Sequence, residues 1–156
     1  MSLDLENFIC GFIATNYPYL PLTNIAIFRT SAVDVCFPSC CKWSAPGEPR
    51  GLSVTPSGNL LVTCREPNKL VELSVDSGKS VREIELQSDI EDPWRSVQLT
   101  TGQFVVCHGL FDLQRVCVVG DDGKVTRSYG GEPGSDVGQL DYPRHLAVDK
   151  THSLYL

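Results

Sequence analysis

The sequence predicts an all-β fold built from repeated sheets, and three observations lead to this prediction. Thirteen glycines and ten prolines are spread along 156 residues, which indicates many turns and therefore many short strands. The runs between these turns are rich in Val, Leu, Thr and Phe, and some of them alternate with polar residues. No stretch long enough for a typical helix carries a helical stripe of apolar residues. A hydrophobic fraction of 42% and a charged fraction of 21% are typical of a globular domain.

The same pattern occurs three times along the chain. Residues 49–62, 93–106 and 143–156 each start with a proline, continue through an alternating stretch and a turn, and end in a second apolar stretch. From Pro49 the pattern recurs at Pro93 and again at Pro143. A period of roughly 45 residues is typical of a repeat architecture in which each unit is one small sheet.

Each complete unit is predicted to hold four strands. In the first unit we expect them near 50–55, 59–64, 69–75 and 81–86, and in the second near 94–99, 103–107, 114–119 and 125–129. Glycines at 58, 78, 102 and 123 mark the tight turns, because glycine accepts a positive φ. A repeated four-stranded meander is the pattern of a β-propeller blade, whose apolar faces are covered by neighbouring blades.

The predicted architecture is an incomplete β-propeller of two full blades with partial flanking blades. We expect residues 1–44 to form a degenerate or partial blade or an N-terminal extension, with strands at Asn24–Arg29 and Val33–Phe37. Residues 45–156 form the propeller fragment, with blades near 49–92, 93–142 and a truncated 143–156. Because an unclosed propeller exposes sheet edges, we expect a truncated chain or self-association through the open blade edges.

The third unit resembles the NHL repeat. Tyr129-Gly130-Gly131 leads through Gly134 and Gly138 to Pro143, then Leu146–Asp149, a turn and Leu154-Tyr155-Leu156, similar to the family pattern. The resemblance implies a propeller of six blades and a turn-building role for Asp149. The chain departs from the family pattern where Cys64 and Cys107 stand at the expected aspartate, and where His145 replaces a glycine.

Composition and motifs exclude several classes of protein. A net charge of −6 with only thirteen Lys plus Arg argues against a large phosphate-binding footprint. The apolar run at 8–14 follows acidic residues and is too short to span a bilayer, so we expect a cytoplasmic protein without membrane association. We interpret Cys64, Cys107 and Cys117 as buried thiols. A degenerate outer strand explains the spacing of Cys36, Cys40 and Cys41 about as well as a zinc site does, and no histidine lies nearby in the sequence.

The candidate binding residues follow the three prolines. Arg50, Trp94 and Arg144 occupy equivalent positions, and two cations with an indole argue against a metal ion over the propeller channel. Together with Arg95 and His145 they would form a basic, aromatic arc on one face of the propeller. The alternative is that each arginine pairs with a neighbouring carboxylate and that Trp94 packs between blades.

The predicted function is a non-catalytic binding module that mediates protein–protein interaction. In the TRIM-NHL proteins the propeller selects the target of a ubiquitin ligase, so the resemblance implies a substrate-recognition role within a longer ligase. RNA binding, which some NHL propellers perform, is the alternative. A propeller-type lyase or hydrolase ranks third, because His108, His145 and His152 do not form a recognisable metal set. We expect no cofactor, no metal and no catalytic residue.

Overall fold

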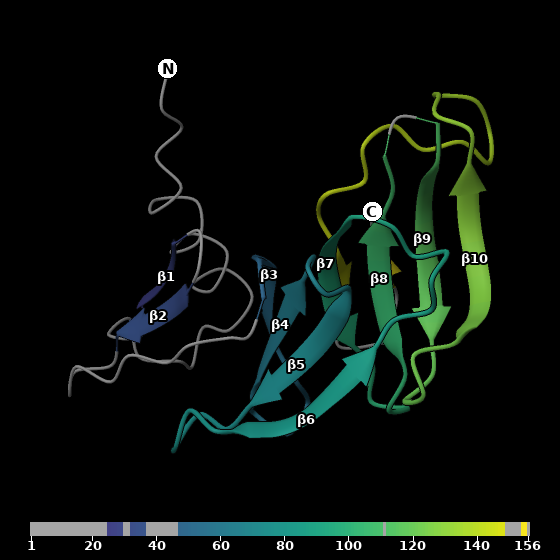
Figure 1. The fold of residues 1–156 in the computed structure, drawn as a ribbon. Helices are drawn as coiled ribbons and strands as arrows, with labels where there is room; N and C mark the ends of the chain where they lie inside the picture. Colours follow the sequence, from purple (N-terminus) through teal and green to yellow (C-terminus); the bar gives the residue numbers. More distant parts are fainter. Residues whose placement is uncertain (1–24, 30–31, 37–46, 111, 149–153, 156) are drawn as a thin grey trace.

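The computed structural model describes residues 25–29, 32–36, 47–110, 112–148 and 154–155. Their regular structure consists of strands, and no helix occurs among these residues (Figure 1). Two four-stranded antiparallel sheets dominate the fold. The predicted all-β, incomplete propeller is therefore confirmed.

Each large sheet is a meander in chain order. The first sheet contains β3 (Pro49–Val54), β4 (Leu60–Cys64), β5 (Lys69–Leu73) and β6 (Ser80–Glu85). The second contains β7 (Pro93–Gln98), β8 (Phe104–His108), β9 (Gln114–Val119) and β10 (Val125–Gly131). Every strand boundary lies within two residues of the predicted one.

Two short hairpins flank these sheets in the sequence. One pairs β1 (Ile25–Arg29) with β2 (Ala32–Cys36), and the other pairs β11 (Ala147–Val148) with β12 (Leu154–Tyr155). The first hairpin falls where the sequence predicted two strands. Its assignment to an earlier blade stays a prediction, because most of residues 1–44 lies outside the described part of the chain.

The repeat reproduces the same turn in both sheets. Between β3 and β4, the Thr55 amide donates to the Asn59 carbonyl at 2.8 Å, and Gly58 has a φ of 86°. Between β7 and β8, the Leu99 amide donates to the Gln103 carbonyl at 2.8 Å, and Gly102 has a φ of 89°. Both glycines occupy the left-handed region that other residues rarely adopt.

Strand register corrects one detail of the predicted repeat alignment. Pro49 pairs with Cys64, and Pro93 pairs with His108. The counterpart of Cys64 is therefore His108, and the predicted match between Cys64 and Cys107 is wrong by one residue. Both β4 and β8 are apolar runs with a cysteine near the end, and this similarity led to the incorrect alignment of Cys64 with Cys107.

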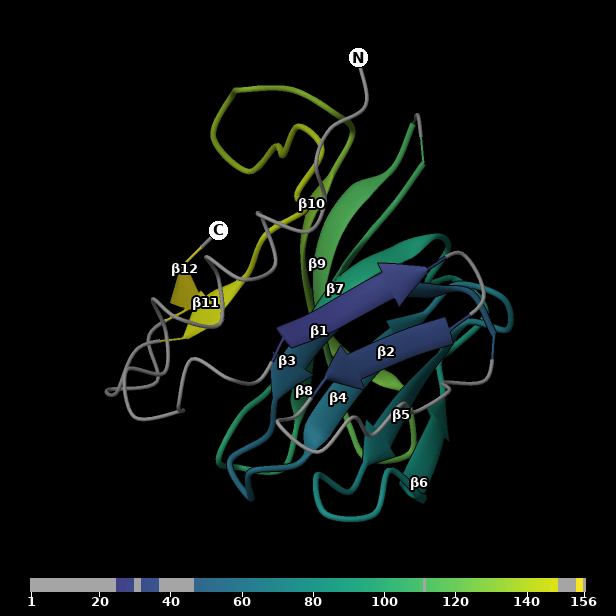
Figure 2. The same ribbon diagram turned by 90° about the vertical axis from the view of Figure 1, so that its left-hand side faces the viewer.

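The two sheets stack against each other through one hydrophobic core. Figure 2 shows β3 and β4 lying beside β7, and both strands contact β7. The core draws residues from both sheets and from the segment that joins them: Leu61, Leu70, Ile84, Leu86, Ile90, Phe104, Val106, Cys117 and Val119. Mutual burial of sheet faces is what holds neighbouring propeller blades together.

A second core covers the other face of the second sheet. Val105, Cys107 and Val116 pack there with Leu146, which follows Pro143 in the third unit. Leu140 and Trp94 border this cluster and are partly buried. Leu146 of the third unit therefore covers part of this face of the second sheet.

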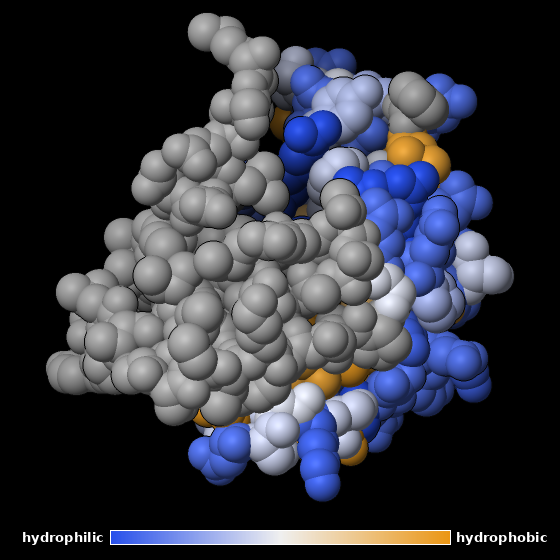
Figure 3. Space-filling view, turned by 60° about the vertical axis from the view of Figure 1, so that its left-hand side comes forward, coloured by the Kyte–Doolittle hydropathy of each residue, from blue (hydrophilic) through white to orange (hydrophobic). Residues whose placement is uncertain are grey.

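The visible described surface on one side of the molecule is mostly polar (Figure 3). Figure 3 shows mostly hydrophilic residues on the described part of one side, with small hydrophobic patches among them. No helix of the described residues is long and apolar enough to cross a membrane.

Candidate binding surface

A repeated irregularity places the candidate residues. In β3 the residues Pro49 and Gly51 pair with consecutive residues of β4, so Arg50 is an extra residue in the ladder. The same two-against-one count occurs between β7 and β8, where Trp94 is the extra residue. These are β-bulges, which bend a strand and change the direction of a side chain. A β-bulge therefore positions Arg50 in the first large sheet, and an equivalent β-bulge positions Trp94 in the second.

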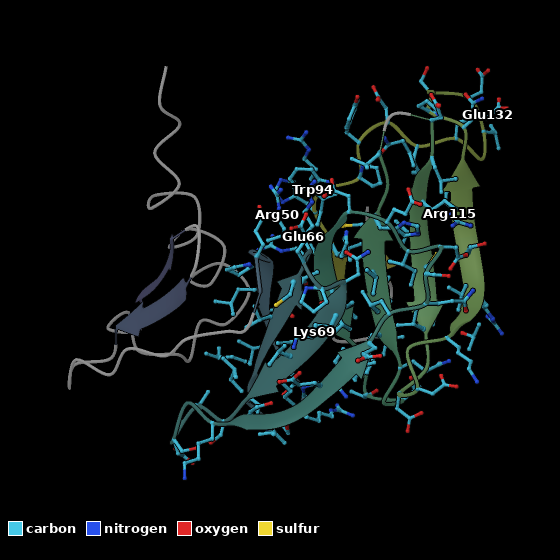
Figure 4. All side chains as sticks on the ribbon, in the orientation of Figure 1. Arg50, Glu66, Lys69, Trp94, Arg115 and Glu132 are labelled. Carbon is cyan, nitrogen blue, oxygen red and sulfur yellow. The ribbon has the colours of Figure 1, made fainter. Side chains whose placement is uncertain are left out.

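Two guanidinium groups lie over the Trp94 indole. The guanidinium carbon of Arg50 is 5.1 Å from the ring centroid, and that of Arg144 is 4.6 Å from it. Arg144 also lies 5.5 Å from the ring centroid of Tyr142. These distances are within the range of a cation–π contact. We call Arg50, Trp94, Tyr142 and Arg144 the Trp94 surface. Figure 4 shows Arg50 and Trp94 together near the ends of their strands.

The two arginines differ in their anionic neighbours. Arg50 is partly buried and forms an ion pair with Glu48 at 3.0 Å. Arg144 is exposed, and no carboxylate of the described residues lies within ion-pair distance of it. The alternative expected from the sequence, in which each arginine pairs with a carboxylate, therefore holds for Arg50 and not for Arg144 within the described part of the chain.

Arg95 and His145 form a separate, more enclosed contact. Arg95 is only 8% exposed, and its Nη2 donates to the Leu52 carbonyl of the first sheet at 3.3 Å. Its Nη1 lies 3.5 Å from the Nδ1 atom of His145, which is exposed. Arg95 therefore links the first sheet to the third unit beneath the Trp94 surface.

The charge state of His145 follows from this contact. Partial burial lowers the pKa of His145, and the positive charges of Arg95 and Arg144 lower it further. The lowered pKa favours the neutral imidazole, whose Nδ1 accepts a hydrogen bond from Arg95. The positive charge of the arc comes from the arginines alone.

Sequence reasoning missed three residues that complete the arrangement. Tyr142 is 50% exposed and lies under Arg144, while Glu48 contacts both Arg50 and Arg65. Arg65 in turn pairs with the buried Asp92 at 2.9 Å. A signal was present: Glu48, Asp92 and Tyr142 each directly precede one of the repeat prolines. Asp92 and Tyr142 also share a positive φ, at 47° and 49°, which is uncommon outside glycine.

The remaining candidate chemistry lies in the core. Burial raises the pKa of Cys64 to about 11 and that of Cys107 to about 12, and it also raises the pKa of Cys117. All three are free, buried thiols, as predicted. The His108 Nε2 lies 3.3 Å from the Cys117 Sγ, but both groups are buried. A protonated, buried thiol is a poor nucleophile.

Several residues weighed in the sequence lie outside the described part of the chain. These are Cys40, Cys41, Asp149 and His152. Among the described residues, no three His, Cys, Asp or Glu side chains are grouped so that they could hold a metal ion.

Comparison with known proteins finds solved structures with a similar fold, but it does not identify a family. No family model and no curated protein sequence matches the chain. A protein of unknown function from Bacteroides caccae is similar, with a TM-score of 0.63 and 16% identity over 85% of this chain and 48% of that one. Hydrazine synthase from Kuenenia stuttgartiensis is similar with a TM-score of 0.60 and 15% identity, over 83% of this chain and 37% of that one. The β-propeller domain of Cps50 (Swd1) from Myceliophteria thermophila matches with a TM-score of 0.47 and 17% identity, over 61% of this chain and 32% of that one.

These findings define a class of protein. The described residues form two stacked four-stranded antiparallel sheets, the blade arrangement of a β-propeller. The chain spans less than half of the length of each of the three solved structures named above.

Proposed function

We propose that the chain is a non-catalytic binding module and that the Trp94 surface contacts a protein partner. The observation that carries this proposal is Arg144, whose exposed guanidinium packs on two aromatic rings and has no carboxylate of the described residues beside it. A guanidinium that is oriented by aromatic rings keeps its N–H donors for an anionic group of a ligand. Arginine and tryptophan are also the residues most enriched where binding energy concentrates.

The wider assignment rests on the NHL resemblance of residues 129–156. We propose that the propeller serves as the substrate-recognition part of a longer, cytoplasmic ubiquitin ligase, in which other domains carry out the transfer chemistry. The candidate nucleophiles and base Cys107, Cys117 and His108 are buried in the core, which disfavours a catalytic role for them.

RNA binding is the second candidate, because arginines beside an aromatic ring suit a phosphate chain and its bases. Two features of the site disfavour it. Two guanidinium groups already lie over the Trp94 ring, so a base that stacked there would have to displace one of them. Glu48 and Glu66 lie beside the neighbouring Arg65, where they would repel an extended chain of phosphates.

A binding selection tests the proposal directly. The sequence has two tryptophans, so a Trp43→Phe variant leaves Trp94 as the only indole. This variant is immobilised and offered a random peptide library and a random single-stranded RNA pool in parallel. Selected ligands are then titrated in solution while Trp94 fluorescence is recorded, at several salt concentrations.

The expected result is a set of peptides whose binding is lost in Arg144→Ala and retained in Arg127→Ala. Arg127 is a matched control because it is an exposed arginine on the outer strand β10. Selection of RNA alone, with an affinity that falls steeply with salt, would replace the proposal by the RNA alternative. Selection of neither ligand would contradict both.

A further inference from the structure

The geometry of the Trp94 surface limits the shape of its ligand. The Arg50 and Arg144 guanidinium carbons lie 5.1 Å and 4.6 Å from one ring centroid, so their separation is no larger than these two distances together. Two anionic groups that bind both arginines must therefore lie within one short segment of the ligand. In an extended peptide, side chains at i and i+2 point the same way and lie about 6.6 Å apart along the strand.

The chain supplies its own example of the anion that Arg50 accepts. The Glu48 Oε1 lies 3.0 Å from the Arg50 Nη2, and the two side chains are 37% and 25% exposed. A carboxylate from a ligand would meet Arg50 at a position where a carboxylate is already bound. Arg144 has no such neighbour among the described residues and is the open position of the pair.

We propose that the Trp94 surface binds an extended acidic peptide in which Asp or Glu side chains at positions i and i+2 contact Arg144 and Arg50. In this arrangement the ligand carboxylate competes with Glu48 for Arg50, and the half-exposed Tyr142 ring lies against the peptide beside Arg144. The inference deepens the proposed function and rests on it.

A short acidic motif fits the surroundings better than a long polyanion. Glu66, Glu48 and Asp92 all lie around Arg65, and Glu48 also pairs with Arg50. A peptide with two carboxylates in one short stretch places its charge on Arg50 and Arg144 and leaves this acidic side uncovered. An extended run of charges would cross it and be repelled.

Defined peptides test the spacing without any change to the protein. Three peptides of equal length are titrated into the Trp43→Phe chain with Trp94 fluorescence as the readout. The first carries glutamates at i and i+2, the second has the same composition with the glutamates at i and i+1, and the third has glutamines at i and i+2. We expect the first to bind about five- to tenfold more tightly than either other peptide, as the loss of one charged contact implies.

Variants of the chain test the assigned residues. Arg144→Ala and Arg50→Ala should each remove the preference for the i, i+2 peptide, whereas Arg127→Ala should keep it. Glu48→Gln removes the competing carboxylate and should tighten binding about two- to fivefold, the range that an exposed ion pair implies. Circular dichroism checks that each variant is folded, and a glutamine substitution at the same residue replaces any alanine variant that is not.

The outcomes separate this inference from the function on which it rests. Equal affinity for the i, i+2 and i, i+1 peptides, or weaker binding by Glu48→Gln, would overturn the acidic-peptide inference. If the library selects peptides without paired carboxylates that still require Arg144, the binding function stands and the inference fails. If no peptide binds, both fail.

Discussion

Gly51 shows how one missing side chain positions the site. A Cβ atom at this position would lie 2.6 Å from the Trp94 carbonyl oxygen and 2.9 Å from the Arg95 Cα, so β3 and β7 approach each other only because residue 51 has none. We expect Gly51→Ala to lower the free energy of unfolding by about 1–3 kcal/mol, since rigid backbone must move to make room. Urea denaturation followed by circular dichroism measures this change.

The control for this substitution is Gly131→Ala. Gly131 lies at the end of β10, where an added Cβ would meet no atom within 4 Å. Its substitution should be neutral or slightly stabilising, because alanine restricts the unfolded chain more than glycine does. Equal destabilisation by the two substitutions would show that contact between β3 and β7 is not the cause.

His108 gives the fold a measurable dependence on pH. Burial lowers the pKa of His108 from its ordinary value of 6.5 to about 4, and the charge of Arg115 acts in the same direction. The unfolded chain therefore takes up a proton at a higher pH than the folded chain does. Stability is fully present above pH 6.5 and falls as pH drops toward 4, with a slope of up to about 1.4 kcal/mol per pH unit from this group.

Replacing His108 with glutamine should flatten that slope. The test compares the slope of unfolding free energy against pH, so a uniform loss of stability in the variant does not affect it. A smaller slope should remain from His145, whose pKa is also lowered by burial and by nearby arginines. An unchanged slope in His108→Gln would contradict the assignment.

At the scale of strands, the sequence predicts the sheets better than it predicts the site. Alternation, turn glycines and the proline period locate all eight strands of the two large sheets, because these patterns reflect burial and backbone conformation directly. The bulges at Arg50 and Trp94 depend on how many residues of one strand oppose the next, which alternation does not encode. For the same reason the sequence missed Glu48 and Tyr142, whose roles arise from contacts across strands and units.

A buried hydroxyl pair joins the two sheets. The Thr63 Oγ1 on β4 and the Ser96 Oγ on β7 lie 2.7 Å apart and are fully enclosed. Thr63→Val or Ser96→Ala should each lower the unfolding free energy by about 1–3 kcal/mol, because each leaves one buried hydroxyl without its partner.

The double variant tests whether the two hydroxyls act together. It should lose less stability than the sum of the two single losses, with a coupling of about 1 kcal/mol measured by denaturant unfolding. Ser53→Ala is the matched control, since the buried Ser53 Oγ has no hydrogen-bond partner among the described residues and its removal should not destabilise the chain. Strictly additive losses for Thr63 and Ser96 would argue against the pair.

At the scale of the whole molecule, the overall negative charge and the local positive charge of the Trp94 surface have opposite effects on the binding of anionic ligands. The chain carries a net charge of −6, yet Arg50 and Arg144 both lie over one indole. General attraction of polyanions is therefore weak, and a ligand gains affinity only where its own anionic groups match this local cluster. Selectivity for a short acidic motif follows from this contrast between a local and an overall charge.

The two large sheets are expected to unfold as one unit, because a single core contains residues of both. Phe104 is fully buried in this core, which also contains Leu61 of β4 and Cys117 of β9. Phe104→Ala should lower the unfolding free energy by about 3–5 kcal/mol, the usual effect of removing a large core side chain.

Native-state hydrogen exchange should report this loss equally for amides of β4 and of β8, although the substitution lies only in β8. Val81→Ala, at a residue that is 53% exposed on β6, should change exchange at neither strand. Protection that falls in β8 and persists in β4 would show that each sheet is stable by itself, and the shared core would then not be what holds the blades together.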